Sequence, residues 1–378
     1  MKRQLSLILA LVLSLSLLAT MVACDTGDAP KETTQSATQA PTQAPTNAPT
    51  EAPTEAPTES ETPTESEPET DAPSDGTTEN VADQPVEGAI NIASAEDLIA
   101  WADTINVDGM DYMDVTINFI ADIDLAGHNW TPIDGAYLDC VTFEGNGHTI
   151  KNMTIEGTDE LYPDAVHNFP YGFAFIQNAE YDLTFRNLNF DSVNITAWER
   201  HVGVLVGNVY GNAWLTFENV HVSNINLDGW MDYTNQKDNG GHNIAFRVSG
   251  FVGGVFAGEL FFENCSVKNA KMTGFHNLAA FVGYDATGNV NADCFTNCHA
   301  ENLEMTFSYC LSDSYTVDQP KKFVSVFYNA ADWVDNIDDF ADTDNTYKDI
   351  YFIDYTDPEA VHTPADFRSW TYEEAYPN

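Results

Sequence analysis

One segment type recurs four times in this chain, and this repeat constrains the fold more than any other feature of the sequence. Its copies run over residues 183–196, 215–228 and 260–273, with a degenerate copy over 293–306. Self-similarity at a regular spacing is typical of stacked-repeat folds. The repeat therefore predicts an architecture, and it does not name a reaction.

Apolar residues in the first copy alternate with polar ones, as they do in strands that bury one face. The alternation shifts parity twice, between Phe185 and Leu188 and between Phe190 and Val193. A strand that shifts parity and keeps its apolar face inward must turn a corner. Each repeat is therefore expected to form three short strands joined by two corners, which is one coil of a parallel β-helix.

Small polar residues occupy both expected corners in every copy. The first corner carries Asn187, Asn219, Asn264 and Asn297, and the second carries Ser192, Asn224, Asn269 and Asn302. Asparagine tolerates left-handed backbone angles, and its amide can bond its own backbone. Stacked coils lie about 4.8 Å apart, so aligned amides should form hydrogen-bonded ladders. Asn219 and Asn264 are predicted to be interior corner residues.

A Gly-rich apolar element precedes several copies of the repeat, over residues 202–207, 248–253 and 278–283. Its spacing and context do not fit a nucleotide-binding loop, because no helix pattern follows it. The element Val202-Gly-Val-Leu-Val-Gly207 is similar to the GLUG motif of bacterial surface proteins. Residues 94–98, 121–133 and 143–155 are similar to the entry segment of the same group.

The resemblance to the GLUG group covers most of the chain from Ala89 to about Tyr328. It implies an exported, right-handed parallel β-helix. The motif also occurs as an accessory part of larger surface adhesins and peptidases. No catalytic residue belongs to the motif, so the resemblance carries none over to this chain.

The first 23 residues have the pattern of a bacterial lipoprotein signal peptide. Lys2 and Arg3 precede an apolar run that ends in Met21-Val-Ala-Cys24. The expected mature chain begins at a lipidated Cys24 on the outer face of the cell membrane, which it contacts through the lipid alone. A plain signal peptide with an incidental cysteine and an uncleaved spanning helix are the alternatives, although the apolar run is short for a bilayer.

Residues 24–88 and 89–378 differ in composition. The first segment repeats Ala-Pro-Thr with acidic residues and almost no large apolar ones, so it is expected to be a disordered stalk. The second should form the β-helix head. Ser94 can cap a helix that runs to about Ile105 and covers the first coil. An irregular cap is expected from about residue 332, with a last strand over residues 346–353.

The charge is strongly negative, at −45 for the whole chain. Of the 59 acidic residues, 15 lie in the stalk, which leaves 44 in the head against 11 Lys and Arg. This balance excludes nucleic acid, whose binding needs clustered cations, and disfavours docking on anionic lipid. Divalent cations and basic partners stay open.

The segments that return from one coil to the next should emerge along one side of the head and carry its binding site. Aromatic and amide-rich loops suit sugar rings, because the CH face of a sugar stacks on an aromatic ring. The alternative is that these aromatics pack on the coils. The residues expected to contact a ligand are Trp198, His201, Trp230, Tyr233, His242 and Tyr309.

The sequence offers no recognisable catalytic or metal-binding motif. Acidic residues are so many that their proximity in sequence carries almost no information about catalysis. The histidines lack zinc-ligand spacing, so no metal site is expected. Asp342-x-Asp344-Asn345 is similar to part of a Ca²⁺ loop but lacks its Gly and Glu, so Ca²⁺ binding competes with a solvated acidic turn.

Five cysteines remain after Cys24. Cys265 and Cys298 fall on the same inward position of consecutive copies, so they should pack as small apolar side chains. Reduced thiols are favoured, and a disulfide between them stays open if the coils are adjacent. The pairing state of Cys140, Cys294 and Cys310 is open as well.

The sequence favours a monomeric, lipid-anchored surface protein whose head binds a glycan or another surface protein, as an adhesin does. A polysaccharide lyase or glycoside hydrolase acting on the loop-bearing side is the first alternative. A passive spacer is the second.

Overall fold

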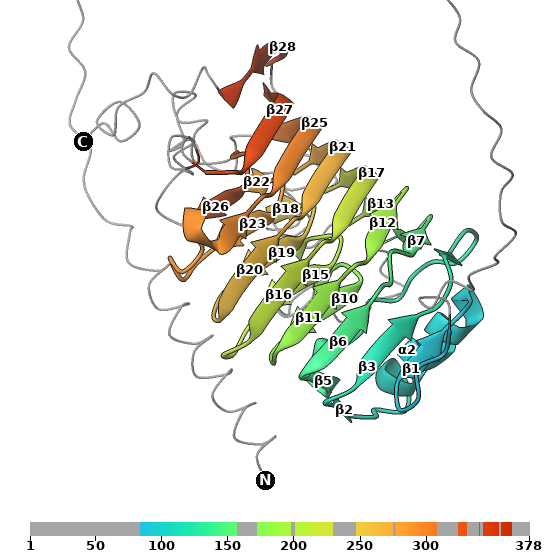
Figure 1. Ribbon diagram of the computed structural model, residues 1–378. Helices are drawn as coiled ribbons and strands as arrows, with labels where there is room; N and C mark the ends of the chain where they lie inside the picture. The colour runs from blue at the N-terminus through green and yellow to red at the C-terminus, as the bar shows by residue number, and fades with distance from the viewer. Residues whose placement is uncertain are drawn as a thin grey trace, which may run out of the picture. The chain divides into compact units, whose positions relative to one another are not determined.

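In the computed structural model, the described residues are 84–156, 172–197, 201–229, 247–274, 277–307, 324–330, 340, 343–354 and 357–364. They all belong to one compact unit, Asp75–Asn378. This unit is mostly β-sheet and almost all its strand pairs are parallel, which confirms the expectation of an all-β head (Figure 1). One α-helix lies within the described residues.

The first strand of each repeat joins a seven-stranded parallel sheet of order β1-β3-β6-β11-β16-β20-β24. Its strands are β1 (Ile90–Ile92), β3 (Thr116–Phe119), β6 (Val141–Glu144), β11 (Leu183–Arg186), β16 (Trp214–Glu218), β20 (Glu259–Glu263) and β24 (Phe295–Thr296).

The rest of each repeat joins a ten-stranded sheet of order β28-β27-β25-β21-β17-β12-β7-β4, in which β13 also pairs with β17 and with β8. Its strands are β4 (Ile123–Asp124), β7 (Thr149–Lys151), β8 (Thr154–Glu156), β12 (Asn189–Asp191), β13 (Asn194–Thr196), β17 (His221–Asp228), β21 (Ser266–Thr273), β25 (His299–Phe307), β27 (Thr346–Asp354) and β28 (Asp357–His362).

The Gly-rich element forms two further parallel sheets. One holds β9 (Gly172–Phe173), β14 (His201–Val202), β18 (Arg247–Ser249) and β22 (Leu278–Ala279). The other holds β10 (Ile176–Ala179), β15 (Val206–Val209), β19 (Val252–Val255), β23 (Val282–Asp285) and β26 (Tyr328–Ala330). Glycine is required here because the strands approach closely: a Cβ on Gly207 would lie 2.4 Å from the Cα of Gly172.

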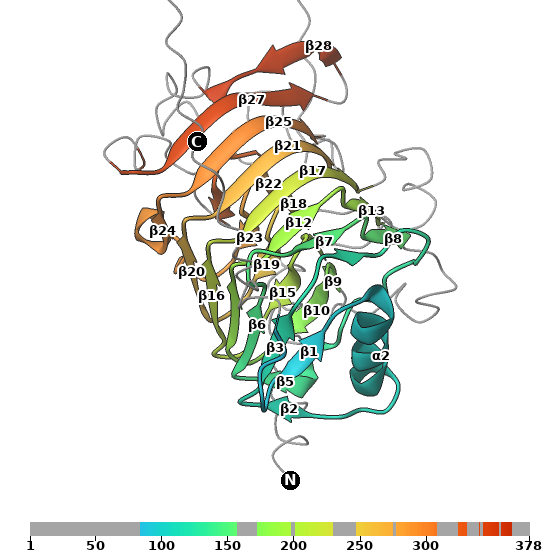
Figure 2. The ribbon, with the colours of Figure 1, turned by 45° about the vertical axis from the view of Figure 1, so that its right-hand side comes forward.

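Short elements complete the described chain. Strands β2 (Tyr112–Met113) and β5 (Leu138–Asp139) pair with each other, and two 3₁₀ turns, η2 (Gly135–Tyr137) and η4 (Ala292–Cys294), precede β5 and β24. From Gly172 onward, the chain passes through the two Gly-rich sheets, then the seven-stranded sheet, then the ten-stranded sheet, and repeats this order (Figure 2).

Matching positions of successive repeats lie in register. In the seven-stranded sheet Phe185 pairs with Phe143 on one side and with Phe217 on the other, and Phe217 pairs with Phe262. These rings stack nearly parallel at centroid distances of 4.7, 5.4 and 4.8 Å in that order along the sheet. Phe295 extends the column by 4.8 Å beyond Phe262. The alternating pattern therefore places one phenylalanine per repeat in a continuous buried column.

The first-corner residues have the left-handed backbone that the parity shift predicts. Their φ angles are 52° at Asn187, 53° at Asn219, 53° at Asn264 and 50° at Asn297. Amides of successive copies bond each other: Asn219 donates to Oδ1 of Asn187 at 3.0 Å, and Asn297 donates to Oδ1 of Asn264 at 2.6 Å. The prediction that Asn219 and Asn264 are interior is wrong, because both side chains are exposed. The turn carries the amide outward while Val220 and Cys265 point inward.

The second corner differs from the expectation. It separates two strands, β12 and β13, only in the first copy; in the later copies β17, β21 and β25 run through it unbroken. The corner residue keeps a positive φ, for example 54° at Asn224 and 53° at Asn269. Asn269 donates to Asn224 at 3.1 Å, and Asn302 donates to Asn269 at 2.9 Å. The corner is therefore a bend inside one sheet.

Helix α2 (Ala95–Asn106) begins after Ser94, whose hydroxyl accepts the backbone N–H of Asp97 at 3.2 Å. It buries Leu98, Trp101 and Ile105 against the sheets. The Trp101 ring meets the Phe143 ring edge-on at 5.9 Å. The helix that the sequence predicted is therefore present, and it packs against the first ring of the phenylalanine column.

The last predicted strand is present as β27, which pairs in parallel with β25. Strand β28 then pairs antiparallel with β27, which the sequence did not predict (Figure 1). Cys265 and Cys298 are buried and free, as their aligned inward positions predicted, and burial raises the pKa of the Cys265 thiol. Cys140 and Cys294 are free as well, and Cys310 lies outside the described residues.

Candidate functional site

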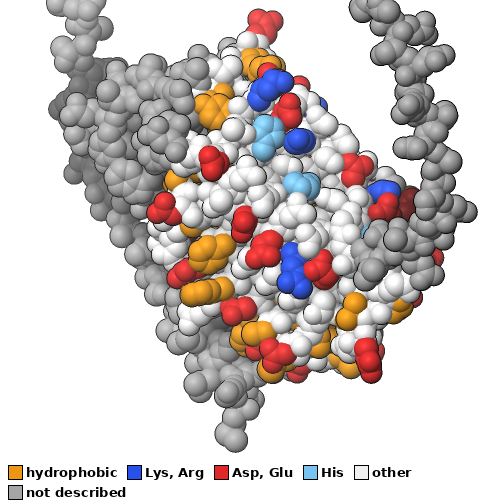
Figure 3. All heavy atoms as spheres, viewed as in Figure 1, with side chains coloured by type: hydrophobic (Ala, Val, Ile, Leu, Met, Phe, Trp, Pro, Cys, Tyr) orange, Lys and Arg blue, Asp and Glu red, His pale blue; other side chains and the backbone are white. Residues whose placement is uncertain are grey.

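Two aromatic rings stand exposed side by side on the outer face of the seven-stranded sheet. Trp214 opens β16 and is 56% exposed, and Phe261 lies in the adjacent strand β20 and is 38% exposed. Their ring centroids are 5.9 Å apart and their planes are inclined by 55°. Figure 3 shows hydrophobic side chains over this region with acidic side chains around them. We call Trp214 and Phe261 the aromatic pair.

Strand alternation explains why both rings face outward. Leu215 and Phe217 fill the core from β16, so Trp214 points to the opposite face. In β20, Leu260 and Phe262 point inward and Phe261 between them points outward. Both positions are therefore set by the same register that builds the core.

A hydrogen bond holds the start of β16 in place. The carboxylate of Asp182, just before β11, accepts the backbone N–H of Trp214 at 2.8 Å. The bond extends the pairing of β11 with β16 to the first residue of β16. The backbone that carries the Trp214 ring is therefore anchored to the sheet, and the ring is not on a free loop.

Three exposed glutamates border the aromatic pair. Glu259 is the Cα partner of Trp214, and Glu218 is the Cα partner of Glu263. Glu259 and Glu263 lie two residues either side of Phe261 on the same face of β20. Within the described part of the chain, none of these three carboxylates has a hydrogen-bonding or ion-pair partner. The aromatic pair is therefore set in a negative surface.

Glu218 and Glu263 belong to a row of successive Cα partners that continues through Arg186 to Glu144, and the charges at that end are paired. Arg186 is the Cα partner of Glu144 and of Glu218, and its guanidinium pairs with the Glu144 carboxylate. Glu144 also accepts the amide of Asn187 at 3.0 Å. Opposite charges are thus matched at one end of the row, while Glu218 and Glu263 face each other as like charges.

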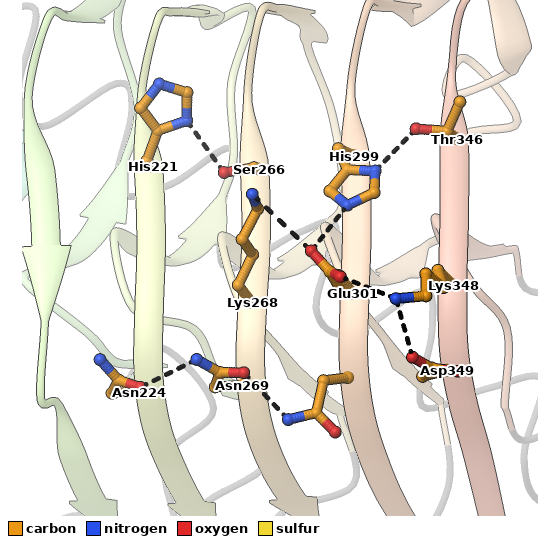
Figure 4. Close-up of polar contacts among 11 residues, drawn as sticks. His221, Asn224, Ser266, Lys268, Asn269, His299, Glu301, Thr346, Lys348 and Asp349 are labelled. Carbon is orange, nitrogen blue, oxygen red and sulfur yellow. Dashed lines mark hydrogen bonds and ion pairs between the residues drawn. The ribbon is translucent and has the colours of Figure 1, made fainter. Parts of the chain in front are cut away.

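A second polar surface lies on the ten-stranded sheet, across β17, β21, β25 and β27 (Figure 4). His221 Nδ1 lies 2.9 Å from the hydroxyl of Ser266, and His299 Nδ1 lies 2.6 Å from the hydroxyl of Thr346. Lys268, Glu301 and Lys348 form the neighbouring row. Cationic side chains gather over this part of the surface in Figure 3. We call these seven residues the histidine–lysine network.

Glu301 is the centre of this network. Its carboxylate lies 3.2 Å from Nε2 of His299, 3.4 Å from Nζ of Lys348 and 3.8 Å from Nζ of Lys268. The hydrogen bond from His299, together with Lys348, lowers the pKa of Glu301. The network links three adjacent strands. The side chains of Lys268, His299 and Lys348 are already paired with the Glu301 carboxylate.

Thr346, His299 and Glu301 form a hydroxyl–imidazole–carboxylate chain, which is the arrangement of an activated nucleophile. The backbone N–H groups of His299 and Thr346 are bonded to the carbonyls of Cys265 and Cys298, each at 2.9 Å. These two N–H groups therefore cannot serve as an oxyanion hole. The chain of contacts fits cross-strand stabilisation better than acyl transfer.

His201 is the one predicted contact residue whose side chain the structure describes, and it does not lie on the surface. It is 1% exposed, hydrogen-bonds the Arg247 guanidinium and meets the Phe256 ring at 5.2 Å. The same guanidinium lies 3.7 Å from the centroid of Tyr284. His201 therefore belongs to a packed cluster, and its prediction as a ligand contact on an exposed loop face is wrong.

The other predicted contacts, and Cys24, lie outside the described residues; they are Trp198, Trp230, Tyr233, His242 and Tyr309. In the segment that is similar to part of a Ca²⁺ loop, Asn345 is buried. Its amide bonds the backbone of Cys298 at 2.7 Å and of Phe295 at 2.9 Å. In the described ranges, no group of three or more His, Cys, Asp or Glu side chains is arranged to hold a metal ion.

Sequence reasoning missed the aromatic pair, although the repeat carried a signal for it. Trp214 directly precedes the inward Leu215, and Phe261 falls between the inward Leu260 and Phe262. Outward aromatic residues on two neighbouring repeats form a contiguous apolar patch, and such a patch can mark an interaction site.

Comparison with known proteins adds little. No family model and no curated protein matches the chain. Among solved structures, the crystal structure of a putative immunoglobulin A1 protease from Bacteroides ovatus is similar at 15% identity and a TM-score of 0.39, over 72% of this chain and 78% of that one. At that TM-score the likeness carries no argument about this chain.

Proposed function

We propose that this chain is a lipid-anchored bacterial surface protein whose head binds carbohydrate through the aromatic pair. The observation that carries the proposal is the pairing of Trp214, 56% exposed, with Phe261, 38% exposed, on adjacent strands of a rigid sheet. Large aromatic rings are costly to leave in water. Sugar rings present an apolar CH face that stacks on them, while their hydroxyls bond to nearby carboxylates.

The proposal includes the fold of the head as a right-handed parallel β-helix of the GLUG type. In-register pairing of matching positions, from Phe143 through Phe295, supports stacked coils. The constant order in which the chain visits the sheets supports it as well. Parallel strands joined by crossover connections are almost always right-handed, which supports the handedness.

The anchor is proposed from the leader and Cys24, which lie outside the described residues. No helix among the described residues is long and apolar enough to cross a membrane. In this proposal the acidic, Pro-rich segment up to residue 88 holds the head away from the membrane. A head that stands clear of the envelope can reach glycans or partners outside the cell.

A glycan array probed with the full chain tests the function. Trp214→Ala and Phe261→Ala should each weaken binding by about fivefold or more, because a stacking aromatic contributes about 1 kcal/mol or more. Tyr351→Ala is the matched control, since Tyr351 is 37% exposed on the ten-stranded sheet and should bind as the parent does. Circular dichroism must show that each variant keeps the fold.

Two results would contradict the proposal. One is the absence of carbohydrate binding by the full chain. The other is binding that survives both Trp214→Ala and Phe261→Ala. Testing Trp230→Ala on the same array addresses the loop-side site, which stays a prediction. If Trp230→Ala alone abolishes binding, the site lies on the loops and not on the sheet.

One observation favours the second candidate, a glycoside hydrolase. Glu218 and Glu263 are Cα partners on adjacent strands beside the aromatic pair. Retaining glycosidases hold two carboxyl groups about 5 Å apart, a spacing that adjacent strands can provide. Mass spectrometry of any bound glycan after incubation distinguishes the two functions. Cleavage that Glu218→Gln and Glu263→Gln each abolish would establish the hydrolase, and an intact glycan would favour the binding module.

A further inference from the structure

The aromatic pair lies in a negatively charged part of the surface. Glu218, Glu259 and Glu263 are exposed around it and have no cationic partner in the described part of the chain. The nearest matched cation of the row, Arg186, is paired with Glu144. Arg186 is also the Cα partner of Glu218, so Glu259 and Glu263 are the carboxylates of this group without a cation on the neighbouring described strands. A ligand that stacks on Trp214 or Phe261 therefore meets a net negative surface.

The register makes this charge unfavourable without a ligand. Glu218 and Glu263 are directly opposite each other on β16 and β20, and like charges directly opposite across strands destabilise a sheet. Glu259 adds a third charge beside Trp214. A ligand cation placed between Glu218 and Glu263 would relieve their repulsion as well as form new contacts. An anionic sugar would add to it.

The Trp214 ring also favours a cationic ligand. Trp is the strongest aromatic partner for a cation, and a cation over its face is attracted by the ring quadrupole. A ligand that combines an apolar ring face with a positive charge can use both the stacking and the carboxylates. The whole head, with 44 acidic and 11 basic residues, adds a long-range attraction for cations.

We propose that the aromatic pair and its three glutamates form a binding site for amino sugars with a free, protonated amine. This inference rests on the proposed function and specifies its ligand: a glucosamine-type unit stacks on Trp214 or Phe261. Its ammonium group pairs with Glu259 beside Trp214, or with Glu218 and Glu263 beside Phe261. Acetylation of the amine removes the charge and much of the preference. Uronic acids are excluded by repulsion.

The test is calorimetric titration of the full chain with four probes at about pH 6, where the carboxylates are ionised and amines are protonated. The probes are the β-1,4-linked tetramers of glucosamine and of N-acetylglucosamine, the α-1,4-linked tetramer of galacturonate, and tetralysine. The glucosamine tetramer should bind most tightly and the galacturonate tetramer should not bind. Raising the salt concentration should weaken the binding of the glucosamine tetramer and not that of the acetylated one.

Matched variants test whether the glutamates cause the preference for the charged sugar. Glu259→Gln and Glu263→Gln should each weaken glucosamine binding by about two- to fivefold, the range expected for an exposed ion pair, and leave N-acetylglucosamine binding unchanged. Glu304→Gln, an exposed glutamate on the ten-stranded sheet, is the control and should change neither. Trp214→Ala should weaken both sugars.

Each other outcome overturns a definite part of the reasoning. Equal, Trp214-dependent affinity for the two amino sugars would refute the charge preference and leave the carbohydrate function standing. Tetralysine that binds as tightly as the glucosamine tetramer, competes with it and depends on Glu263 would show that the ligand is a basic peptide. Failure of all three sugar tetramers to bind would overturn this inference, and the proposed function would fall with it only if the glycan array also showed no binding.

Discussion

Replacing Phe217 by alanine should destabilise the head more than most single substitutions. Phe217 is fully buried in the middle of the phenylalanine column, stacked on Phe185 at 5.4 Å and on Phe262 at 4.8 Å. The Phe251 ring closes the third side edge-on at 5.5 Å. Phe→Ala substitutions in cores cost about 3–5 kcal/mol.

The structure places Phe217→Ala toward the upper end of that range. The cost of a cavity depends on how far the surroundings can collapse into it. Here Phe185 and Phe262 are held by backbone pairing of β11, β16 and β20 in fixed register, so they cannot move toward each other. Each lost aromatic pair adds about 0.5–1.5 kcal/mol beyond the buried area.

Phe217→Leu separates the two effects. Leucine keeps most of the volume and loses both stacking contacts, so we expect a cost of about 1–2 kcal/mol. In a double-mutant cycle, Phe217→Leu and Phe262→Leu should couple by about 0.5–1.5 kcal/mol, because the two rings contact each other directly. The stability changes of two substitutions at positions that do not contact each other should be additive.

Urea unfolding of the full chain, followed by far-ultraviolet circular dichroism, measures these changes. The slope against urea should stay constant so that midpoints report stability. Phe261→Ala is the control, because Phe261 lies one residue from Phe262 on the opposite face and loses only its partly exposed contact with Trp214, which should cost about 0.2–1 kcal/mol. If Phe217→Ala costs no more than Phe261→Ala, the phenylalanine column is not the core.

Three further predictions concern the corners, the histidine–lysine network and the leader. Asn219→Leu should cost about 1–3 kcal/mol, since leucine cannot bond across the ladder and tolerates a φ of 53° poorly, whereas Asn226→Ala in the adjoining strand should cost about 0.5 kcal/mol or less in the same urea assay. Partial burial of His221 and the nearby Lys268 ammonium lower the pKa of His221. The unfolded chain therefore binds more protons below about pH 6.5, so stability should decrease as the pH is lowered through that range. His221→Gln should flatten that decline between about pH 7 and pH 5 in thermal unfolding scans, and an unchanged slope would show that His221 does not contribute. Intact mass of the membrane-extracted chain should show a diacylglyceryl group on Cys24 that Cys24→Ser removes, and an unmodified terminus elsewhere would exclude the anchor.

The sequence predicted the elements whose signals are local. The period-two alternation identified inward residues such as Phe185 and Leu215, both buried. The parity shift located corners with positive φ at Asn187 and Asn264. Ser94 and the apolar face after it predicted α2. In each case a few neighbouring residues contain the whole physical cause.

The errors arose where a side chain's environment depends on distant residues. The amides of Asn219 and Asn264 are exposed because the backbone turns them outward at the corner. His201 is buried because Arg247 and Phe256, from the next pass of the chain, cover it. Neither neighbour is close in sequence, so no local pattern could reveal the contact.

By itself, the sequence of this protein determined the repeat, the strand faces, the corners and the charge, because these depend on spacing within a few residues. Only the tertiary structure decided which outward side chains meet. Trp214 and Phe261 are 47 positions apart in the chain and become neighbours through the pairing of β16 with β20. The same pairing sets Glu218 against Glu263. A binding surface on a stacked sheet is made across strands, and register between strands is a property of the whole fold.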